Sequence, residues 1–231
     1  MSDRPYTLLS CGMSIDGYLS AGTSTRLMLS NDADFDRVDA ERAASDAILV
    51  GASTIRNDNP RLLVRSPERR AARVARGLPP SPTKVTVTRH AELDCAASFF
   101  AADGAEKIVY CPTDVVPEAR GRLGAAAAVV DAGRPATMRR VCEDLGERGV
   151  QRLMVEGGGT VHTQLLTDDL ADELQLVVAP FFVGDSSACR FVGDGSYPWN
   201  PSRRATLAEV RQIGDVVLLR YALSPRFREG A

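Results

Sequence analysis

The segment best suited to chemistry is a triple glycine with its two neighbours, Glu156 to Thr160. It joins an apolar run that ends at Val155 to a helical pattern of apolar residues that begins at Val161. Glycine permits positive φ and close approach of main-chain N–H groups, and a helix start adds unpaired donors and partial positive charge. This combination suits a phosphate, although a tight turn without a ligand has the same local pattern. The spacing matches neither the Rossmann fingerprint nor the P-loop.

Polar side chains also follow a second apolar run, which starts at Ala47. A buried strand is predicted to end at Gly51, where a turn or a helix start follows. In open α/β sheets, ligands bind beyond the carboxyl ends of strands, so one pocket could be lined by Thr54, Asp58, Leu62 and Arg65. Taken alone, the Asn-Asp-Asn-Pro stretch that contains Asp58 is also an ordinary turn signal.

A third segment, Ser14-Ile15-Asp16-Gly17, comes directly after the first apolar run. Its Asp-Gly step indicates only a turn. This segment therefore indicates a binding site only in combination with the other two segments.

Short apolar runs separated by helical or polar stretches must position these three segments. Such alternation predicts an α/β domain with a mostly parallel sheet whose strands are covered on both faces. Two further runs flank Gly214-Asp215 and predict a C-terminal antiparallel hairpin. The expected strands are 6–13, 47–50, 85–87, 107–111, 127–130, 153–155, 174–179, 207–213 and 216–223.

Helices are expected at Ala33–Ala44, after a cap at Ser30 or Asn31, and at 136–148 and 160–166. No repeat or domain boundary is visible, so we expect a single domain over residues 1–231. Ser66–Pro82 is rich in arginine and proline and predicts a long surface excursion. A solvated loop is one interpretation of it, and arginines that help to hold an anionic substrate are the other.

Composition excludes several classes of function. Lys plus Arg number 28 against 30 for Asp plus Glu, and a net charge of −2 gives no reason to expect nucleic acid or an anionic membrane as partner. Five scattered cysteines and two histidines cannot form a zinc cluster, so no metal is expected. The odd cysteine count and the absence of a long uncharged apolar run predict a reducing, cytoplasmic compartment.

Taken together and in this order, the three segments resemble the reductase family of riboflavin biosynthesis. That family comprises the C-terminal domain of the bifunctional deaminase-reductase and the stand-alone pyrimidine reductases, and the resemblance extends from Leu9 to about Leu223. It implies a dihydrofolate-reductase-like fold, NADPH as cofactor and usually a homodimer. It also implies reduction of a ribosylaminopyrimidine 5′-phosphate to the ribitylamino compound, with hydride delivered to the ribose C1′.

The resemblance assigns residues to two ligands. On the substrate side it places Arg42, Leu62, Arg65 and Glu156, of which the two arginines suit a phosphate. Glu156 and Asp58 are candidates for a catalytic role, and no activated nucleophile is indicated. On the cofactor side it places the loop at Ser14, the strand end at Gly51, the adenosine-side pair Thr88 and Arg89, and the remaining residues Thr54, Asp58, Gly157, Gly158, Gly159, Thr160 and Val161.

The chain also departs from the family pattern. Tyr18 stands where many members carry lysine, which removes a positive charge, and Arg26-Leu27-Met28 stands in place of a Ser-x-Trp pair. His162 could touch a phosphate, although a capping or surface position is the plainer expectation.

The zinc motif of the deaminase is absent, so deamination is not expected of this chain. Three alternatives stay open at this stage. The substrate could be the deaminated or the non-deaminated pyrimidine, the chain could reduce another substrate such as dihydrofolate, or it could bind a nucleotide without catalysis.

Overall fold

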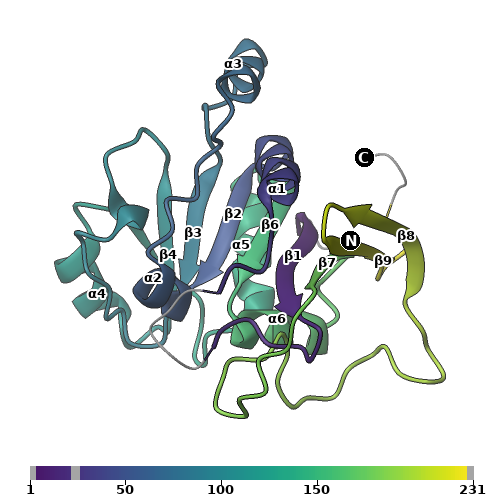
Figure 1. Cartoon of the computed structure of the whole chain (residues 1–231). Coiled ribbons are helices and arrows are strands. Elements are labelled where there is room, and N and C mark those ends of the chain that lie inside the picture. The colour runs from purple at the N-terminus through teal and green to yellow at the C-terminus, as the bar shows by residue number, and fades with distance from the viewer. Residues whose placement is uncertain (1–3, 22–26, 228–231) are drawn as a thin grey trace. The chain divides into compact units, whose positions relative to one another are not determined.

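The computed structural model describes residues 4–21 and 27–227, which form two compact units (Figure 1). Unit 1 contains residues 39–154 and the N-terminal segment before Tyr6, and unit 2 contains residues 6–38 together with those from Val155 onward. The chain passes between the units within the helix α1 (Asp32–Ala44) and the strand β6 (Arg152–Gly157). The expectation of a single domain stays a prediction.

Unit 1 contains four parallel strands in the order β5-β4-β3-β2. They are β2 (Ala47–Gly51), β3 (Thr83–Val87), β4 (Lys107–Cys111) and β5 (Ala128–Asp131). All five residues of β2 are buried, and each of its large apolar side chains contributes about 1.5–3 kcal/mol by leaving water. The short apolar runs therefore became covered parallel strands, as predicted.

Helices connect these strands. They are α2 (Ala52–Asp58), α3 (Pro67–Ala75), α4 (Val116–Leu123) and α5 (Met138–Glu147), with a 3₁₀ turn at Ser98–Phe100. The side chain of Thr137 accepts a hydrogen bond from Arg140 N at 3.3 Å and caps α5, which confirms the helix expected at 136–148.

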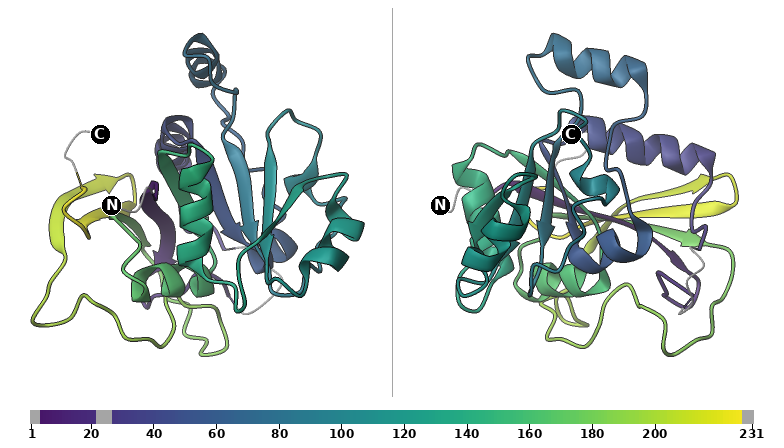
Figure 2. Two further views of the ribbon diagram at one scale, coloured as in Figure 1. Left: turned by 180° about the vertical axis from the view of Figure 1, so that it is seen from behind. Right: turned by 90° about the vertical axis from the view of Figure 1, so that its left-hand side faces the viewer.

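The expectation of an irregular loop at 66–82 is wrong for its first half. Ser66 Oγ accepts a hydrogen bond from Arg69 N at 3.2 Å, and Pro67 occupies the first turn of α3, where its missing N–H costs nothing. Figure 1 and Figure 2 show α3 standing clear of the strands of unit 1. Arg73 anchors it, because this buried side chain donates to the main-chain oxygens of Ala43, Ser45 and Pro79.

Unit 2 contains a mixed arrangement of strands in the order β1-β7-β9-β8. Strand β1 (Tyr6–Ser14) runs parallel to β7 (Glu173–Ala179), and β9 (Val216–Ala222) runs antiparallel to both β7 and β8 (Thr206–Ile213). The predicted C-terminal hairpin is confirmed, with Gly214 at a φ of 61° in its turn. A long connection, residues 180–205, leads from β7 to β8 (Figure 2).

The starts of two helices in unit 2 test the predicted caps and boundaries. Asn31 Oδ1 accepts from Asp34 N at 3.0 Å, so Asn31 rather than Ser30 caps α1. Helix α6 (Gly159–Thr167) follows β6 directly through the glycines, as expected. None of the helices in the described part of the chain is both long and apolar enough to cross a membrane.

Candidate active site

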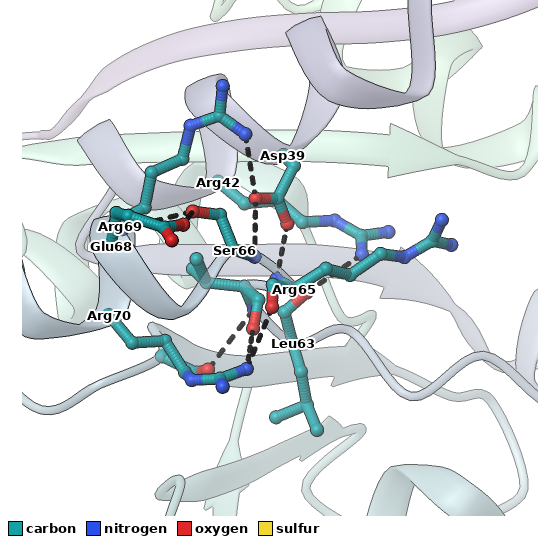
Figure 3. A network of polar contacts seen from close by, with 10 residues as sticks. Asp39, Arg42, Leu63, Arg65, Ser66, Glu68, Arg69 and Arg70 are labelled. Atoms are coloured by element: carbon teal, nitrogen blue, oxygen red, sulfur yellow. Dashed lines mark hydrogen bonds and ion pairs between the residues drawn. The ribbon is translucent and has the colours of Figure 1, made fainter. Parts of the chain in front are cut away.

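In unit 1, a buried carboxylate holds the segment that carries Arg65. Asp39 accepts hydrogen bonds from Arg65 N, from Ser66 N at 3.1 Å and from Arg69 Nη1 at 3.0 Å (Figure 3). Burial raises the pKa of Asp39, but the hydrogen bonds from Arg65 N, Ser66 N and Arg69 outweigh it and hold the pKa below its usual value. Asp39 is therefore an anion that fixes the backbone around Arg65.

Two arginines hold the same segment through its carbonyl oxygens. Arg42 Nη1 donates to Leu63 O at 3.1 Å, and Arg70 Nη1 donates to Val64 O at 3.2 Å and to Arg65 O at 2.9 Å. The Arg65 side chain itself is exposed, and Figure 3 shows it extending to the same side as that of Arg42. Two guanidinium forks on a fixed backbone are suited to a phosphate monoester.

Leu62 lies in this region with an unusual backbone. Its φ is 52°, which is uncommon for a leucine, and the residue is only 1% exposed. Such strain is found where the surrounding structure fixes a conformation, often beside a binding site. Leu62 belongs to the core, and its predicted contact with the substrate stays a prediction.

The strand ends predicted to bind the cofactor lie together in unit 1. Gly51 ends β2 and pairs in register with Val87 of β3, so Thr88 follows at the same edge. Thr88 is buried, and its Oγ1 accepts from Ala91 N at 3.0 Å, whereas the next residue, Arg89, is exposed.

Helix α2 begins directly after Gly51 and carries the next two predicted residues. Thr54 is half-buried, and Asp58 is exposed at the last position of the helix. The carboxyl ends of two neighbouring strands thus present polar groups, as the sequence predicted.

In unit 2, the glycines form an uncapped helix start. Gly157 and Gly158 have φ values of 155° and 95°, and no side chain caps α6. A Cβ at Gly159 would lie 2.3 Å from Arg190 O, so only glycine fits there. Around this turn Glu156 is half-buried, Thr160 is exposed and Val161 is buried. The first N–H groups of α6 are the donors that an anion would use.

The loop after β1 is fastened by Asp16. Ser14 Oγ donates to Asp16 Oδ1 at 2.6 Å and accepts from Tyr18 N at 3.0 Å, while Val183 N and Gly184 N donate to the same carboxylate at 2.8–3.2 Å. The Ser14 hydroxyl lowers the pKa of Asp16 most, burial opposes it, and the two N–H groups complete a fall to about 2. The Ser14 side chain is therefore occupied within the fold, and so is its main chain, because Ser14 N donates to Tyr18 O at 3.0 Å and Ser14 O accepts from Gly17 N at 2.9 Å.

One expectation for unit 2 is wrong. His162 is neither a cap nor a surface residue, because it is 0% exposed and its ring lies 5.4 Å from that of Phe191. The loss of a positive charge at Tyr18 stays a prediction, and another cation lies close to this residue, since Arg190 is over the Tyr18 ring with Cζ 4.9 Å from its centroid. Arg26 falls outside the described residues, and Met28 is exposed.

Sequence reasoning missed Asp39 and Arg190. Asp39 lies one helical turn before Arg42, and an acidic residue in a helix near a predicted substrate arginine is a weak signal. Arg190 lies in the long connection after β7, and no pattern in the sequence links it to Tyr18. Within residues 4–21 and 27–227, no group of three or more His, Cys, Asp or Glu is placed to hold a metal ion.

Comparison with known proteins decides the family. The model of the RibD C-terminal domain matches residues 5–219. The chain belongs to the RibD C-terminal domain family. A relative from Archaeoglobus fulgidus, named 2,5-diamino-6-ribosylamino-4(3H)-pyrimidinone 5′-phosphate reductase, is 31% identical over 226 residues, which cover 97% of this chain and 99% of the relative. A Methanothermobacter thermautotrophicus protein of the same name is 31% identical over 222 residues, 95% of this chain and 99% of its own length.

Similarity to solved structures confirms the fold. Acinetobacter baumannii RibD superimposes with a TM-score of 0.77 at 21% identity over 96% of this chain, which spans only 58% of the RibD chain. A pyrimidine reductase-like protein from Corynebacterium diphtheriae gives a TM-score of 0.78 at 21% identity, covering 96% of this chain and 92% of that one. The dihydrofolate-reductase-like fold predicted from the sequence is therefore confirmed.

Proposed function

We propose that this protein is an NADPH-dependent reductase of 2,5-diamino-6-ribosylamino-4(3H)-pyrimidinone 5′-phosphate. It would reduce the ribosylamino group to the ribitylamino group, with hydride added at the ribose C1′. The observation that carries the proposal is the full-length match to relatives of that name. The non-deaminated pyrimidine is the preferred substrate, because it is the compound in the names of these two relatives, which the chain covers to 99% of their length.

The helix start in unit 2 fits a nicotinamide dinucleotide. Gly158 and Gly159 place no side chain of their own above the first N–H groups of α6, and in the described part of the chain no side chain caps this helix. We assign the pyrophosphate to this turn, from Gly157 to Val161, because those N–H donors and the helix dipole favour an anion. The bound nicotinamide would supply the hydride, and the protein would align it and exclude water.

The other proposed cofactor residues serve the two ends of the dinucleotide. The loop that begins at Ser14 is assigned to the nicotinamide side, and the polar groups at the ends of β2 and β3 are assigned to the adenosine side and the remainder of the dinucleotide. The exposed Arg89 suits the 2′-phosphate that distinguishes NADPH from NADH. The residues from the ends of β2 and β3 are Gly51, Thr54, Asp58, Thr88 and Arg89.

We assign the substrate phosphate to Arg65 and Arg42. Arg65 is the more specific candidate, since Asp39 and Arg70 fix its backbone and Arg42 holds the carbonyl of Leu63 in the same segment. Glu156 is proposed to accept hydrogen bonds from the pyrimidine or the sugar, and Leu62 to lie on the substrate side. Glu156 and Asp58 stay the candidates for a catalytic role.

The proposal is tested by measuring the loss of NADPH absorbance when the enzyme is mixed with NADPH and each purified pyrimidine in turn. We expect turnover with the diamino compound and much slower turnover with the deaminated uracil analogue. If neither pyrimidine is turned over at high enzyme concentration, the proposed function is refuted. If dihydrofolate is turned over faster than both pyrimidines, the site belongs to another substrate. Replacing NADPH with NADH in the same assay tests the cofactor.

Two further properties belong to the proposal. We expect a homodimer, which light scattering during gel filtration would measure. We also expect a reducing, cytoplasmic location, in keeping with the thiols of Cys95 and Cys189, which are free and exposed. Fractionation of cells that produce the protein would test the location.

A further inference from the structure

Arg190 is held in place more firmly than an exposed arginine usually is. Its Nη2 donates to the Tyr18 hydroxyl at 3.0 Å, and its Cζ lies 4.9 Å from the centroid of that ring. Tyr18 is itself 5% exposed. The main chain supports the pair, because Phe191 N donates to Gly17 O at 3.0 Å and Leu19 N donates to Cys189 O at 2.7 Å. The guanidinium group is therefore pre-organised by an aromatic ring, a hydroxyl and two backbone contacts.

This cation has no carboxylate partner among the residues that the structure describes. Arg203 offers the contrast in the same unit, because it stacks on Trp199 with Cζ 5.6 Å from the ring centroid but also pairs with Asp169 at 3.3 Å. An aromatic ring and a phenol hydroxyl leave the charge of Arg190 unneutralised. Guanidinium groups fixed without a counter-charge are suited to receive an anionic ligand.

Arg190 also lies against the glycine turn. Its carbonyl oxygen would lie 2.3 Å from a Cβ at Gly159, so the backbones of the two residues are in direct contact. Gly159 is the first residue of α6, whose N-terminus has no side-chain cap. The unneutralised cation and the free donors of α6 thus come from adjoining pieces of backbone within unit 2.

We propose that Arg190, held on Tyr18, is a cofactor-binding residue that contacts the pyrophosphate of the nicotinamide dinucleotide together with the N-terminus of α6. This inference rests on the proposed function and assigns to that site a cation from a segment that no sequence motif marks. Tyr18 acts as a positioning residue, since it contacts the guanidinium group and directs it. Arg190 adds a charge, and a charge-assisted hydrogen bond is stronger than one between neutral groups.

Equilibrium binding of NADPH, measured by calorimetry on the whole chain, tests the assignment. We expect Arg190→Ala to weaken NADPH binding about tenfold, as loss of one charge-assisted contact predicts, and Arg190→Lys to recover part of it. The slope of affinity against salt concentration should fall in Arg190→Ala, because one charge interaction is lost. Arg203→Ala is the matched control and should bind NADPH as the wild type does, since Arg203 is already paired with Asp169.

Tyr18→Phe keeps the ring and removes the hydroxyl, so we expect it to weaken NADPH binding about twofold to threefold, less than Arg190→Ala. Binding of the pyrimidine substrate to the enzyme without NADPH should be unchanged in Arg190→Ala. A smaller effect on NADPH than on the pyrimidine would overturn the assignment and place Arg190 at the substrate. Equal losses in Arg190→Ala and Arg203→Ala would also overturn it.

The two proposals fail in different ways. If the wild-type chain does not bind NADPH, the proposed function falls and this inference with it. If the wild type binds NADPH and Arg190→Ala binds it equally well, only the role of Arg190 is refuted.

Discussion

Asp39 provides the sharpest test of how the substrate side is built. Its side chain is 4% exposed and accepts hydrogen bonds from Arg65 N, Ser66 N and the Arg69 guanidinium. Asp39→Ala removes all three acceptor contacts and leaves their donors to find water. Each hydrogen bond to a charged group contributes about 1.5–3 kcal/mol. Water that hydrates the three donors in the variant offsets part of the lost stabilisation, so we expect the free energy of unfolding to fall by about 3 kcal/mol in total.

The same substitution should affect function through the backbone of Arg65. We expect KM for the pyrimidine to rise about tenfold, because the guanidinium group is then presented by an unfixed segment. Glu68→Gln is the matched control, since this exposed carboxylate lies in the first turn of α3 and accepts from the Ser66 hydroxyl at 2.6 Å. We expect it to change both quantities little.

The pH dependence of the Asp39 effect follows from the direction of its pKa shift. The pKa of Asp39 is lower in the folded protein than the unfolded value of about 3.9, so its contribution is complete above that value. It is lost as pH falls through the folded pKa. Urea unfolding should therefore show a constant difference between the wild type and Asp39→Ala from pH 7 to about 5 and a smaller one below about 4. A difference no larger than that of Glu68→Gln at pH 7 would refute the reasoning.

Three other predictions concern the glycine turn, His162 and the division between the two ligands. Gly159→Ala should lower the free energy of unfolding by about 1–3 kcal/mol, because the added Cβ would lie 2.3 Å from a main-chain oxygen. Gly193→Ala is the control and should be nearly neutral, because its Cβ would lie 3.7 Å from Thr163 Oγ1. Equal urea midpoints of the two variants would contradict this prediction. Burial lowers the pKa of His162 to about 4, against the opposing effect of the Val155 and Phe191 backbones. Since the unfolded value is about 6.5, the wild type should lose about 3 kcal/mol of stability between pH 7 and 4, and a His162→Gln variant whose stability falls as steeply would disprove it. Arg65→Ala should mainly raise KM for the pyrimidine and Gly158→Val should mainly weaken NADPH binding, so equal effects of each on both ligands would contradict the assignment of these residues.

The sequence by itself determined the elements and the family. Apolar runs and the Gly214-Asp215 turn placed the strands correctly, because strand burial and turn geometry depend on neighbouring residues. Three ordered motifs identified the reductase family. The Ser66-Pro67 helix start was also a local signal, but the arginines and prolines of the stretch concealed it.

Only the tertiary structure decided which polar groups face one another. Tyr18 and Arg190 are 172 residues apart, and Arg65 lies 26 residues from the carboxylate that holds its backbone. His162 shows the same limit, because its place in the first turn of α6 was clear but its burial depends on Phe191 in a distant segment. Contacts of this kind depend on how β-strand connections pack in space, and no local periodicity records them. The sequence therefore predicted a phosphate-binding turn, and the fold determined that an arginine held on Tyr18 lies beside that turn.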